Sequence, residues 1–241
     1  MGETPLRVSL ITPTYNERPN ISLLAEEVFS AVVEFPEIDV ELIVVDDNSP
    51  DGTGEEAEKL GDRYPVQVVH RPGKLGLGSA VMDGFRKSDR DCLGVIDADL
   101  SHDPSVLPQL ILGLRQHDLA LGSRYNPDSR VERWPWYRKL ISQTGVLAAR
   151  QLTGVQDPLS GYFFLHRRVL QGVTLTSPGY KILLEILVKG SWSTFVEVPY
   201  VFRNRQYSTS KLNLNEYYLF SKQLLVFSLA RLKNRTPGSG G

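Results

Sequence analysis

Apolar and polar residues follow two different periods along the first half of the chain. Apolar runs rich in β-branched side chains are typical of buried strands, and they cover 7–12, 40–45, 66–70, 92–96 and 118–122. Between these runs apolar residues recur at helical spacing, which predicts helices over 19–35, 53–63, 77–88 and 104–116. Because strands that alternate with helices form parallel βαβ units, we expect an α/β domain with a mostly parallel sheet.

The second half of the chain is less regular. Its pattern predicts strands over 162–165 and 194–202, and helices over 134–152, 179–189 and 212–232. The last of these helices is strongly apolar at its centre, and the Gly-rich residues that follow it are typical of a flexible tail. We therefore divide the chain into a domain over 1–211, an apolar helix over 212–233 and a tail over 234–241.

The composition is that of a globular domain and not of a disordered chain. Of the 241 residues, 41% are hydrophobic and 23% are charged, which is ordinary for a protein with a packed core. No run reaches the about 18 apolar residues of a transmembrane helix, and we expect no signal peptide. Cys92 is the single cysteine, so we expect no disulfide within the chain and a reducing compartment.

The charge is unevenly distributed, although the net charge is only −1. Residues 124–150 carry +4 and residues 199–235 carry +6, so the rest of the chain carries about −11. Such asymmetry favours an anionic partner for the second half of the chain. A basic face that is merely solvated is the alternative that charge alone leaves open. We do not expect nucleic acid as the partner.

Two carboxylates, Asp97 and Asp99, follow a buried strand with Ala98 between them. Because successive side chains of a strand alternate between its two faces, we expect both carboxylates to point to the same face. Two such acids suit Mg²⁺ or Mn²⁺, which take their other ligands from water or a substrate phosphate. The alternative is a strand end with two solvated acids.

Two other polar loops follow predicted strands and should lie at the same edge of a parallel sheet, where ligands bind. They are 13–17, with an aromatic ring, an amide and a carboxylate, and 46–52, which is dense in turn residues. A Gly-rich loop over 74–80 lacks the order of a P-loop. It is either a tight turn or a place where the backbone approaches a ligand.

These motifs resemble those of inverting glycosyltransferase family 2, and within it those of dolichol-phosphate mannose synthases. The general family motifs are Pro13-Thr14-Tyr15-Asn16-Glu17, the residues from Val45 to Thr53, Lys74 to Gly78, and Asp97-Ala98-Asp99. The more specific ones are Gly122 to Tyr125, Asp157 to Phe163, Gly179 to Glu185, Val198 to Arg203 and Ser208 to Leu212. The resemblance extends from about Val8 to Leu212. One departure is Ser101-His102, where the family pattern has Gln-His.

The resemblance implies a GT-A fold, with helices on both faces of the sheet, and transfer of mannose from GDP-mannose to dolichyl or another polyprenyl phosphate. The nucleotide sugar would contact Pro13, Tyr15, Glu17, Asp47, Lys74, Asp97, Ala98, Asp99, Arg203 and Lys211. Mg²⁺ or Mn²⁺ would bind Asp97 and Asp99, with Ser101 in the place of the third ligand. The acceptor phosphate would contact Arg124, Arg138 and Ser142. The residues expected to take part in catalysis are Asp99, Arg124 and Lys181.

The implied acceptor is a lipid, so the membrane surface is an expected partner. Trp134, Trp136 and Tyr137 beside Arg138 and Lys139 have the composition of an interfacial element, as has the helix over 212–233. The alternative is that these segments pack in the core. The resemblance also points to a membrane-anchoring subunit, or a transmembrane segment beyond this sequence. It implies action at the cytoplasmic face of the endoplasmic reticulum in a eukaryote, or of the plasma membrane in a prokaryote.

Three other functions are compatible with parts of the pattern. A polyprenyl-phosphate glucosyltransferase that uses UDP-glucose would have the same fold and chemistry. A non-catalytic subunit that binds a nucleotide sugar would not need both the acidic pair and the basic residues. A sugar nucleotidyltransferase would need a Gly-rich N-terminal loop with a catalytic basic residue, which this sequence lacks.

Overall fold

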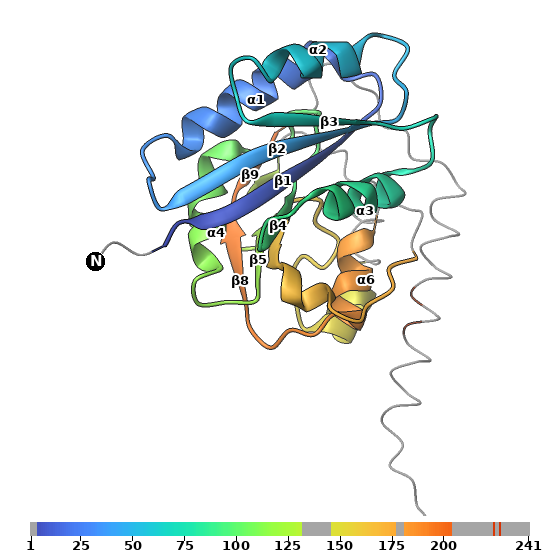
Figure 1. Cartoon of the computed structure of the whole chain (residues 1–241). Helices are drawn as coiled ribbons and strands as arrows, with labels where there is room; N and C mark the ends of the chain where they lie inside the picture. Colours follow the sequence, from blue (N-terminus) through green and yellow to red (C-terminus); the bar gives the residue numbers. More distant parts are fainter. Residues whose placement is uncertain (1–3, 132–145, 177–180, 204–223, 225–226, 228–241) are drawn as a thin grey trace, which may run out of the picture.

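The computed structural model describes residues 4–131, 146–176, 181–203, 224 and 227. In this part of the chain the main sheet has seven strands in the order β3-β2-β1-β4-β7-β5-β8 (Figure 1). The strands are β1 (Leu6–Thr14), β2 (Ile38–Asp46), β3 (Val66–His70), β4 (Cys92–Val95), β5 (Leu119–Ser123), β7 (Phe163–His166) and β8 (Phe195–Pro199). Strand β7 is antiparallel to its neighbours and the other pairs are parallel, which confirms the expected mostly parallel α/β sheet.

Helices cover both faces of the sheet, as expected (Figure 1). The helices and 3₁₀ turns are α1 (Arg18–Val32), α2 (Thr53–Leu60), α3 (Leu77–Lys87), η1 (Pro104–Val106), α4 (Leu107–Gly113), η2 (Arg167–Leu170) and α6 (Ile182–Lys189), and a further helix covers 146–153. Apolar residues of α1, α2 and α4 pack in one core layer, and those of α3 and α6 pack in the other. Successive side chains of a strand point to opposite faces of the sheet, so each strand contributes residues to both layers. In β1, for example, Leu10 faces the first layer and Ile11 faces the second.

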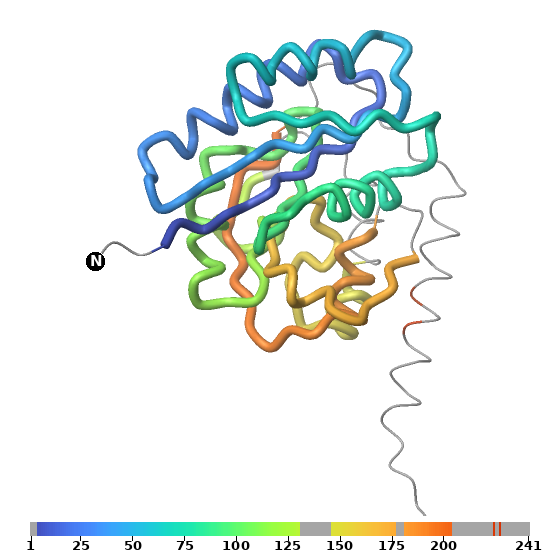
Figure 2. The backbone as a smooth tube through the Cα atoms, in the orientation of Figure 1, coloured from blue at the N-terminus to red at the C-terminus, as the bar shows by residue number. Residues whose placement is uncertain are grey.

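Strand β7 links the two halves of the sheet. It pairs with β4 on one side and with β5 on the other, so residues far apart in the sequence become neighbours. Beyond β5 the sheet ends in β8, and the smooth backbone trace shows the orange segment that contains β8 beside the green segment of β5 (Figure 2). Because β7 runs in the opposite direction, its first residue lies at the edge where the parallel strands end.

Gly94 allows β4 and β7 to pair closely. It lies opposite Phe164 in the antiparallel register, and Phe164 is fully buried. A Cβ atom at position 94 would lie 2.3 Å from Cε1 of that ring, well inside van der Waals contact. The glycine within this apolar strand is therefore required by packing and not by a turn.

Some predicted boundaries differ from the observed ones. The predicted strand over 194–202 is two strands, because the chain leaves the main sheet after Pro199 and continues as β9 (Val201–Phe202). There β9 pairs with β6 (Arg130–Val131), a short strand that we did not predict. The predicted helix over 104–116 begins as a 3₁₀ turn and ends at Gly113. Of the predicted helix over 134–152, only 146–152 lie within the described residues, and they are helical.

A third apolar cluster lies beside the two layers of the core. It joins Val146 and Ala149 to Leu159, Leu184 and Phe227, and Phe227 is only 7% exposed. Phe227 belongs to the predicted segment over 212–233, so this segment contacts the domain at that point. The rest of it, apart from Leu224, and the tail over 234–241 lie outside the described residues. None of the helices that the structure describes is long and apolar enough to cross a membrane.

The packing at Gly94 predicts a large difference between two glycine substitutions. Gly94→Ala forces the buried Phe164 ring or the strand to shift, and overpacking of this kind costs about 1–3 kcal/mol of unfolding free energy. Gly73→Ala is the matched control, because a Cβ atom there would meet nothing within 4 Å. Urea denaturation of both variants measures the cost. Equal stability of the two variants would contradict the packing role of Gly94.

Candidate functional site

Polar residues gather where β1, β2, β4 and β5 end. The register of β1 with β2 sets Thr14 beside Asp46, and the register of β1 with β4 sets Ile11 beside Val95. The chain connects β1 to β2 on one side, whereas β4 lies on the other side of β1. This is the topological switch point where open parallel sheets bind ligands, and every described residue of the predicted site follows or ends a strand near this edge or lies in the loops beside it.

The loops after β1 and β2 are held together through Asp46. The hydroxyl of Thr14 donates to its carboxylate at 3.0 Å, and the amide and hydroxyl of Ser49 donate at 2.9 and 2.5 Å. The backbone N–H of Glu17 donates to the hydroxyl of Thr53 at 3.0 Å. Because buried carboxylates must be paired or hydrogen-bonded, Asp46 serves the loop geometry. The half-buried Pro13, Tyr15 and Glu17 are presented at this edge as a result.

Asp47 and Tyr15, both expected at the nucleotide, have basic partners. The guanidinium of the buried Arg71 pairs with the carboxylate of Asp47, and Nε of Arg71 lies 2.9 Å from Oδ2 of Asp83. The ammonium of Lys74 lies 4.3 Å from the centre of the Tyr15 ring, within the range of a cation–π interaction. Arg71 was not predicted, although its place directly after β3 is a signal, since β3 ends at this same edge.

The acidic pair lies beyond the end of β4 and not within it. The strand ends at Val95, and Leu100 has a positive φ of 61° in the turn that follows. Asp97 and Asp99 therefore do not belong to a strand, as the prediction of their orientation assumed, and the turn orients them instead. Ala98 packs in the core between them. This burial fixes the turn against the first apolar layer.

The two acids differ in their surroundings. The side chain of Asp97 is 29% exposed, whereas Asp99 is buried and accepts a hydrogen bond from the backbone N–H of Ser101 at 3.0 Å. The hydroxyl of Ser101 is buried and has no hydrogen-bond partner in the described part of the chain. Among the described residues no three His, Cys, Asp or Glu side chains are placed to hold a metal ion together. An ion at Asp97 and Asp99 would therefore need further oxygen ligands, and the unpartnered hydroxyl of Ser101 is of the right chemical type.

Arg124 forms a bidentate pair with Asp157. Its Nε and Nη2 donate to the two carboxylate oxygens at 2.8 and 2.9 Å, and its backbone N–H donates at 3.0 Å. Asp157 is fully buried, and its own backbone N–H donates to Glu197 at 2.9 Å. Within the described residues, Nη1 of Arg124 makes no hydrogen bond, so its two N–H groups remain for a ligand. Asp157 was quoted as part of a motif, but its role was not predicted.

The charges of Arg124 and Asp157 shift the pKa of each other's side chain. Burial alone would raise the pKa of Asp157, but the charge and hydrogen bonds of Arg124 hold that pKa below its ordinary value, and the charge of Lys181 lowers it further. Burial would lower the pKa of Arg124, but the charge and hydrogen bond of Asp157, together with Tyr200 and Tyr125, hold that pKa above its ordinary value. Both groups of the pair are therefore charged at neutral pH.

Tyr200 lies beside both the loop of the acidic pair, through His102, and the end of β5, where Arg124 follows. Burial raises the pKa of its hydroxyl well above the ordinary value; Arg124 opposes this shift, and Asp157, Asp97 and Asp99 add to it. The contacts agree with this: His102, in the loop of the acidic pair, meets the edges of Tyr200 and Phe202, each at 5.8 Å, and the guanidinium of Arg124 lies 5.6 Å from the centre of the Phe202 ring. The acidic pair and the Arg124–Asp157 pair therefore border the same space.

Arg203 is placed at this edge by its backbone and by two acids. Its N–H donates to the carbonyl of Ser101 at 2.9 Å. Its guanidinium donates to Asp103 at 3.0 Å and to Glu27 at 3.3 Å. Three other predicted site residues, Arg138, Ser142 and Lys211, lie outside the described residues, as do Trp134, Trp136, Tyr137 and Lys139.

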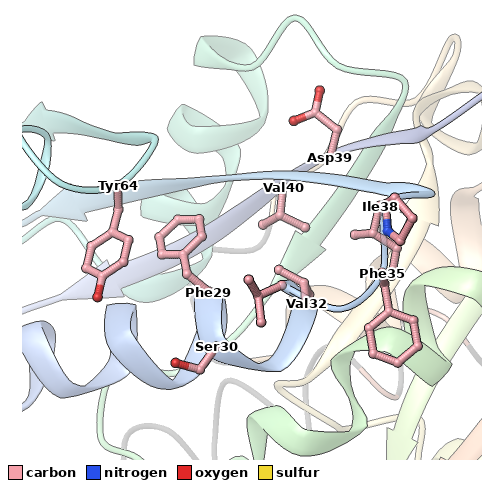
Figure 3. Close-up of a pocket in the computed structure, with 10 residues that line it drawn as sticks. Phe29, Ser30, Val32, Phe35, Ile38, Asp39, Val40 and Tyr64 are labelled. Atoms are coloured by element: carbon pink, nitrogen blue, oxygen red, sulfur yellow. The ribbon is translucent and has the colours of Figure 1, made fainter.

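A hollow elsewhere on the molecule does not coincide with this site. It has a volume of about 540 Å³ and lies between the end of α1 and the start of β2. Phe29 and Tyr64 border it with rings stacked 4.8 Å apart, and Val32, Ile38 and Val40 extend the apolar wall (Figure 3). This is the opposite end of the strands from the acidic pair. Asp39 is the one charged residue in its lining, so it lacks the converging polar groups of a catalytic site.

Known proteins share both the sequence pattern and the fold. A family model described as "Glycosyl transferase family 2" matches residues 9–174. A dolichol-phosphate mannosyltransferase of Pyrococcus furiosus is 45% identical over 86% of this chain, and the match spans 59% of that protein's length. A dolichol-phosphate mannosyltransferase of Saccharomyces cerevisiae is 37% identical over 92% of this chain and 88% of its own length.

A solved structure is similar in fold. The glucosyl-3-phosphoglycerate synthase of Mycobacterium tuberculosis, in complex with Mn²⁺, UDP and glucosyl-3-phosphoglycerate, superposes with a TM-score of 0.67. The match covers 98% of this chain and 82% of that one at 24% identity. This likeness concerns the fold alone, and it confirms the GT-A fold.

The Arg124–Asp157 pair predicts a strong effect of removing one charge. Asp157→Asn leaves Arg124 charged and uncompensated in a buried position, which should lower the unfolding free energy by about 3 kcal/mol at neutral pH. Because the pKa of Asp157 is lowered, this contribution persists down to the ordinary aspartate pKa and is lost as the pH falls through the lowered value. Urea denaturation at several pH values measures it.

Asp89→Asn is the matched control for this substitution. Asp89 is 82% exposed and pairs with Arg7 at 3.6 Å, so its loss should change stability by no more than about 0.5 kcal/mol. If Asp157→Asn were as stable as Asp89→Asn, the pair would not hold the loop that contains Asp157.

Proposed function

The chain belongs to glycosyl transferase family 2, and from that premise we propose that it transfers mannose from GDP-mannose to a polyprenyl phosphate such as dolichyl phosphate. The relatives named dolichol-phosphate mannosyltransferase support the sugar and the lipid class. The observation that carries the proposal is the meeting of the loop of the acidic pair and the Arg124–Asp157 pair around the rings of Tyr200 and Phe202. The acidic pair suits a metal-bound diphosphate, and the arginine pair suits a second phosphate.

The donor would occupy the edge formed by β1, β2 and β4. Tyr15, Glu17 and Asp47 would border the nucleotide, together with Pro13 and Lys74. The pairing of Asp47 with Arg71 fixes one wall of this space, and Lys74 over Tyr15 leaves a cation beside it. Arg203 and Lys211 would lie over the diphosphate. For Arg203 this requires that it exchange part of its contact with Glu27 and Asp103 for phosphate oxygens.

Asp97 and Asp99 would hold Mg²⁺ or Mn²⁺, with Ser101 as a further oxygen ligand. When bound, such an ion stabilises the negative charge that develops on the departing diphosphate. The donor set fits: it consists of two carboxylates and a buried hydroxyl that has no partner in the part of the chain that the structure describes. These are hard oxygen ligands of the kind that Mg²⁺ and Mn²⁺ prefer.

The acceptor phosphate would bind at Arg124, with Arg138, Ser142 and Lys181. Asp157 occupies one side of the guanidinium and fixes its plane, so the N–H groups on Nη1 are already oriented for a phosphate. A phosphate monoester has a second pKa of about 6, so it is largely ionised at neutral pH and needs no strong general base. Its oxygen would attack the anomeric carbon opposite the diphosphate, which inverts the configuration.

A lipid acceptor places the reaction at a membrane surface. We propose the cytoplasmic face. Nucleotide sugars are available on that side, and it is also the reducing compartment that we expect from Cys92 as the single cysteine. Burial raises the pKa of the Cys92 thiol to about 11, so it stays protonated and takes no part in the chemistry. A membrane-anchoring subunit or a further transmembrane segment would hold the domain there, and the segments with Trp134, Trp136 and Tyr137 and over 212–233 would touch the lipid.

The proposal predicts the donor, the acceptor and the metal requirement in one assay. The protein should form polyprenyl-phosphate mannose from GDP-mannose and polyprenyl phosphate only with Mg²⁺ or Mn²⁺, and should use UDP-glucose at least about tenfold more slowly. Asp99→Asn is the control variant, because it loses a ligand charge and should reduce transfer by roughly 10²-fold or more. Product formation from radiolabelled sugar measures each case.

Two results would contradict the proposal. Faster turnover of UDP-glucose would identify a polyprenyl-phosphate glucosyltransferase. Binding of GDP-mannose without any transfer, under conditions where the lipid is in bilayer or detergent form, would identify a non-catalytic nucleotide-sugar-binding subunit.

A further inference from the structure

His102 is buried at the junction of three segments of the site. It is only 2% exposed and lies in the loop that carries Asp97 and Asp99. Its ring stacks on Tyr162 at 5.1 Å with an interplanar angle of 19°, and it meets the edges of Tyr200 and Phe202, each at 5.8 Å. The imidazole therefore touches the residue just before β7, the residue between β8 and β9, and the last residue of β9.

The polar atoms of His102 are directed at Asp97. The backbone N–H of Asp97 donates to Nδ1 at 3.2 Å, so Nδ1 is the unprotonated acceptor and the proton of the neutral ring is on Nε2. That nitrogen lies 3.9 Å from Oδ2 of Asp97, too far for a hydrogen bond and close enough for attraction. One ring therefore contacts both the backbone and the carboxylate of the same residue.

Gly161 limits the space on the other side of this contact. A Cβ atom at position 161 would lie 3.1 Å from Oδ2 of Asp97 and 3.3 Å from Cε1 of His102. The backbone of the loop before β7 thus closes against the carboxylate and the ring together. Asp97 is enclosed between this backbone and the imidazole, although its side chain still has 29% of its surface exposed.

From this geometry we propose that His102 is a positioning residue: by accepting the N–H of Asp97 within a cage of aromatic rings, it fixes the carboxylate that binds the divalent cation. The inference rests on the proposed function only in taking Asp97 as a metal ligand. The imidazole need not touch the metal, the donor or the acceptor. It acts by holding the turn after β4 in one conformation, so that the carboxylate of Asp97 is oriented before the ion arrives.

Three substitutions separate the hydrogen bond from the packing. In His102→Asn the amide oxygen can take the place of Nδ1 as acceptor. In His102→Gln the longer side chain carries its amide to the position of Nε2. No acceptor is then left at the position of Nδ1 for the N–H of Asp97. In His102→Phe the ring remains in the aromatic cage without any acceptor. Each variant is checked for folding by circular dichroism and thermal unfolding.

The readout is the affinity for Mn²⁺, measured by electron paramagnetic resonance on the full chain with GDP present. Residues that orient metal ligands typically contribute about 10-fold to 100-fold to metal affinity. We expect His102→Phe and His102→Gln to weaken Mn²⁺ binding by about tenfold, and His102→Asn to stay within about threefold of wild type. If His102→Phe does not fold, the comparison of Asn with Gln decides.

Three outcomes would overturn the inference. Wild-type Mn²⁺ affinity in a folded Phe or Gln variant would show that the acceptor is not needed. Equal loss in the Asn and Gln variants would show that the shape of the ring matters and not the hydrogen bond. Failure of the wild-type protein to bind Mn²⁺ with GDP would reject the metal assignment in the proposed function, and this inference with it. The wild-type measurement thus tests the metal assignment, and the variants test the role of His102.

Discussion

The reversed direction of β7 is the constraint on which the site depends. A parallel strand in that place would deliver its loop to the far end of the sheet. Because β7 is antiparallel to β4 and β5, the loop that precedes it, with Asp157 and Gly161, lies at the edge where the other strands end. Arg124 at the end of β5 thereby meets Asp157, and Asp97 beyond β4 meets Gly161. Gly94 permits β4 and β7 to pair, because it has no side chain and leaves room for the ring of Phe164.

Buried charge in this site is arranged for orientation more than for stability. A buried ion pair loses hydration on both partners, so the Arg124–Asp157 pair is weak grounds for expecting a more stable protein. What it supplies is a guanidinium with a fixed plane and two remaining N–H groups. The same holds for the buried Arg71, which pairs with the buried Asp47 and with the partly exposed Asp83. The aromatic rings around His102 orient an uncharged side chain in a similar way. In each case the packed surroundings limit the side chain to one arrangement, which is the condition for binding a phosphate or a metal without reorganisation.

Much of the fold could be predicted from the sequence, because the β-branched runs and the helical spacing of apolar residues are local signals. Asp97, Asp99 and Arg124 could be proposed for the site because each follows a predicted strand and belongs to a family motif. The direction of β7 could not be predicted, since alternation identifies a strand but not its partners. For the same reason the partners of Asp157, His102 and Tyr200 were missed. The break between β8 and β9 at Tyr200 was also missed, because an apolar run does not reveal where a strand leaves its sheet.

The central claim is that the phosphate of the acceptor binds Arg124 while the donor binds elsewhere. Arg124→Lys tests it most directly, because lysine keeps the charge and loses the fork that binds Asp157 and a phosphate together. We expect the KM for polyprenyl phosphate to rise by about tenfold while the Kd for GDP stays within about twofold of wild type, in protein that unfolds cooperatively. A selective loss of GDP affinity with an unchanged KM for the lipid phosphate would contradict the account.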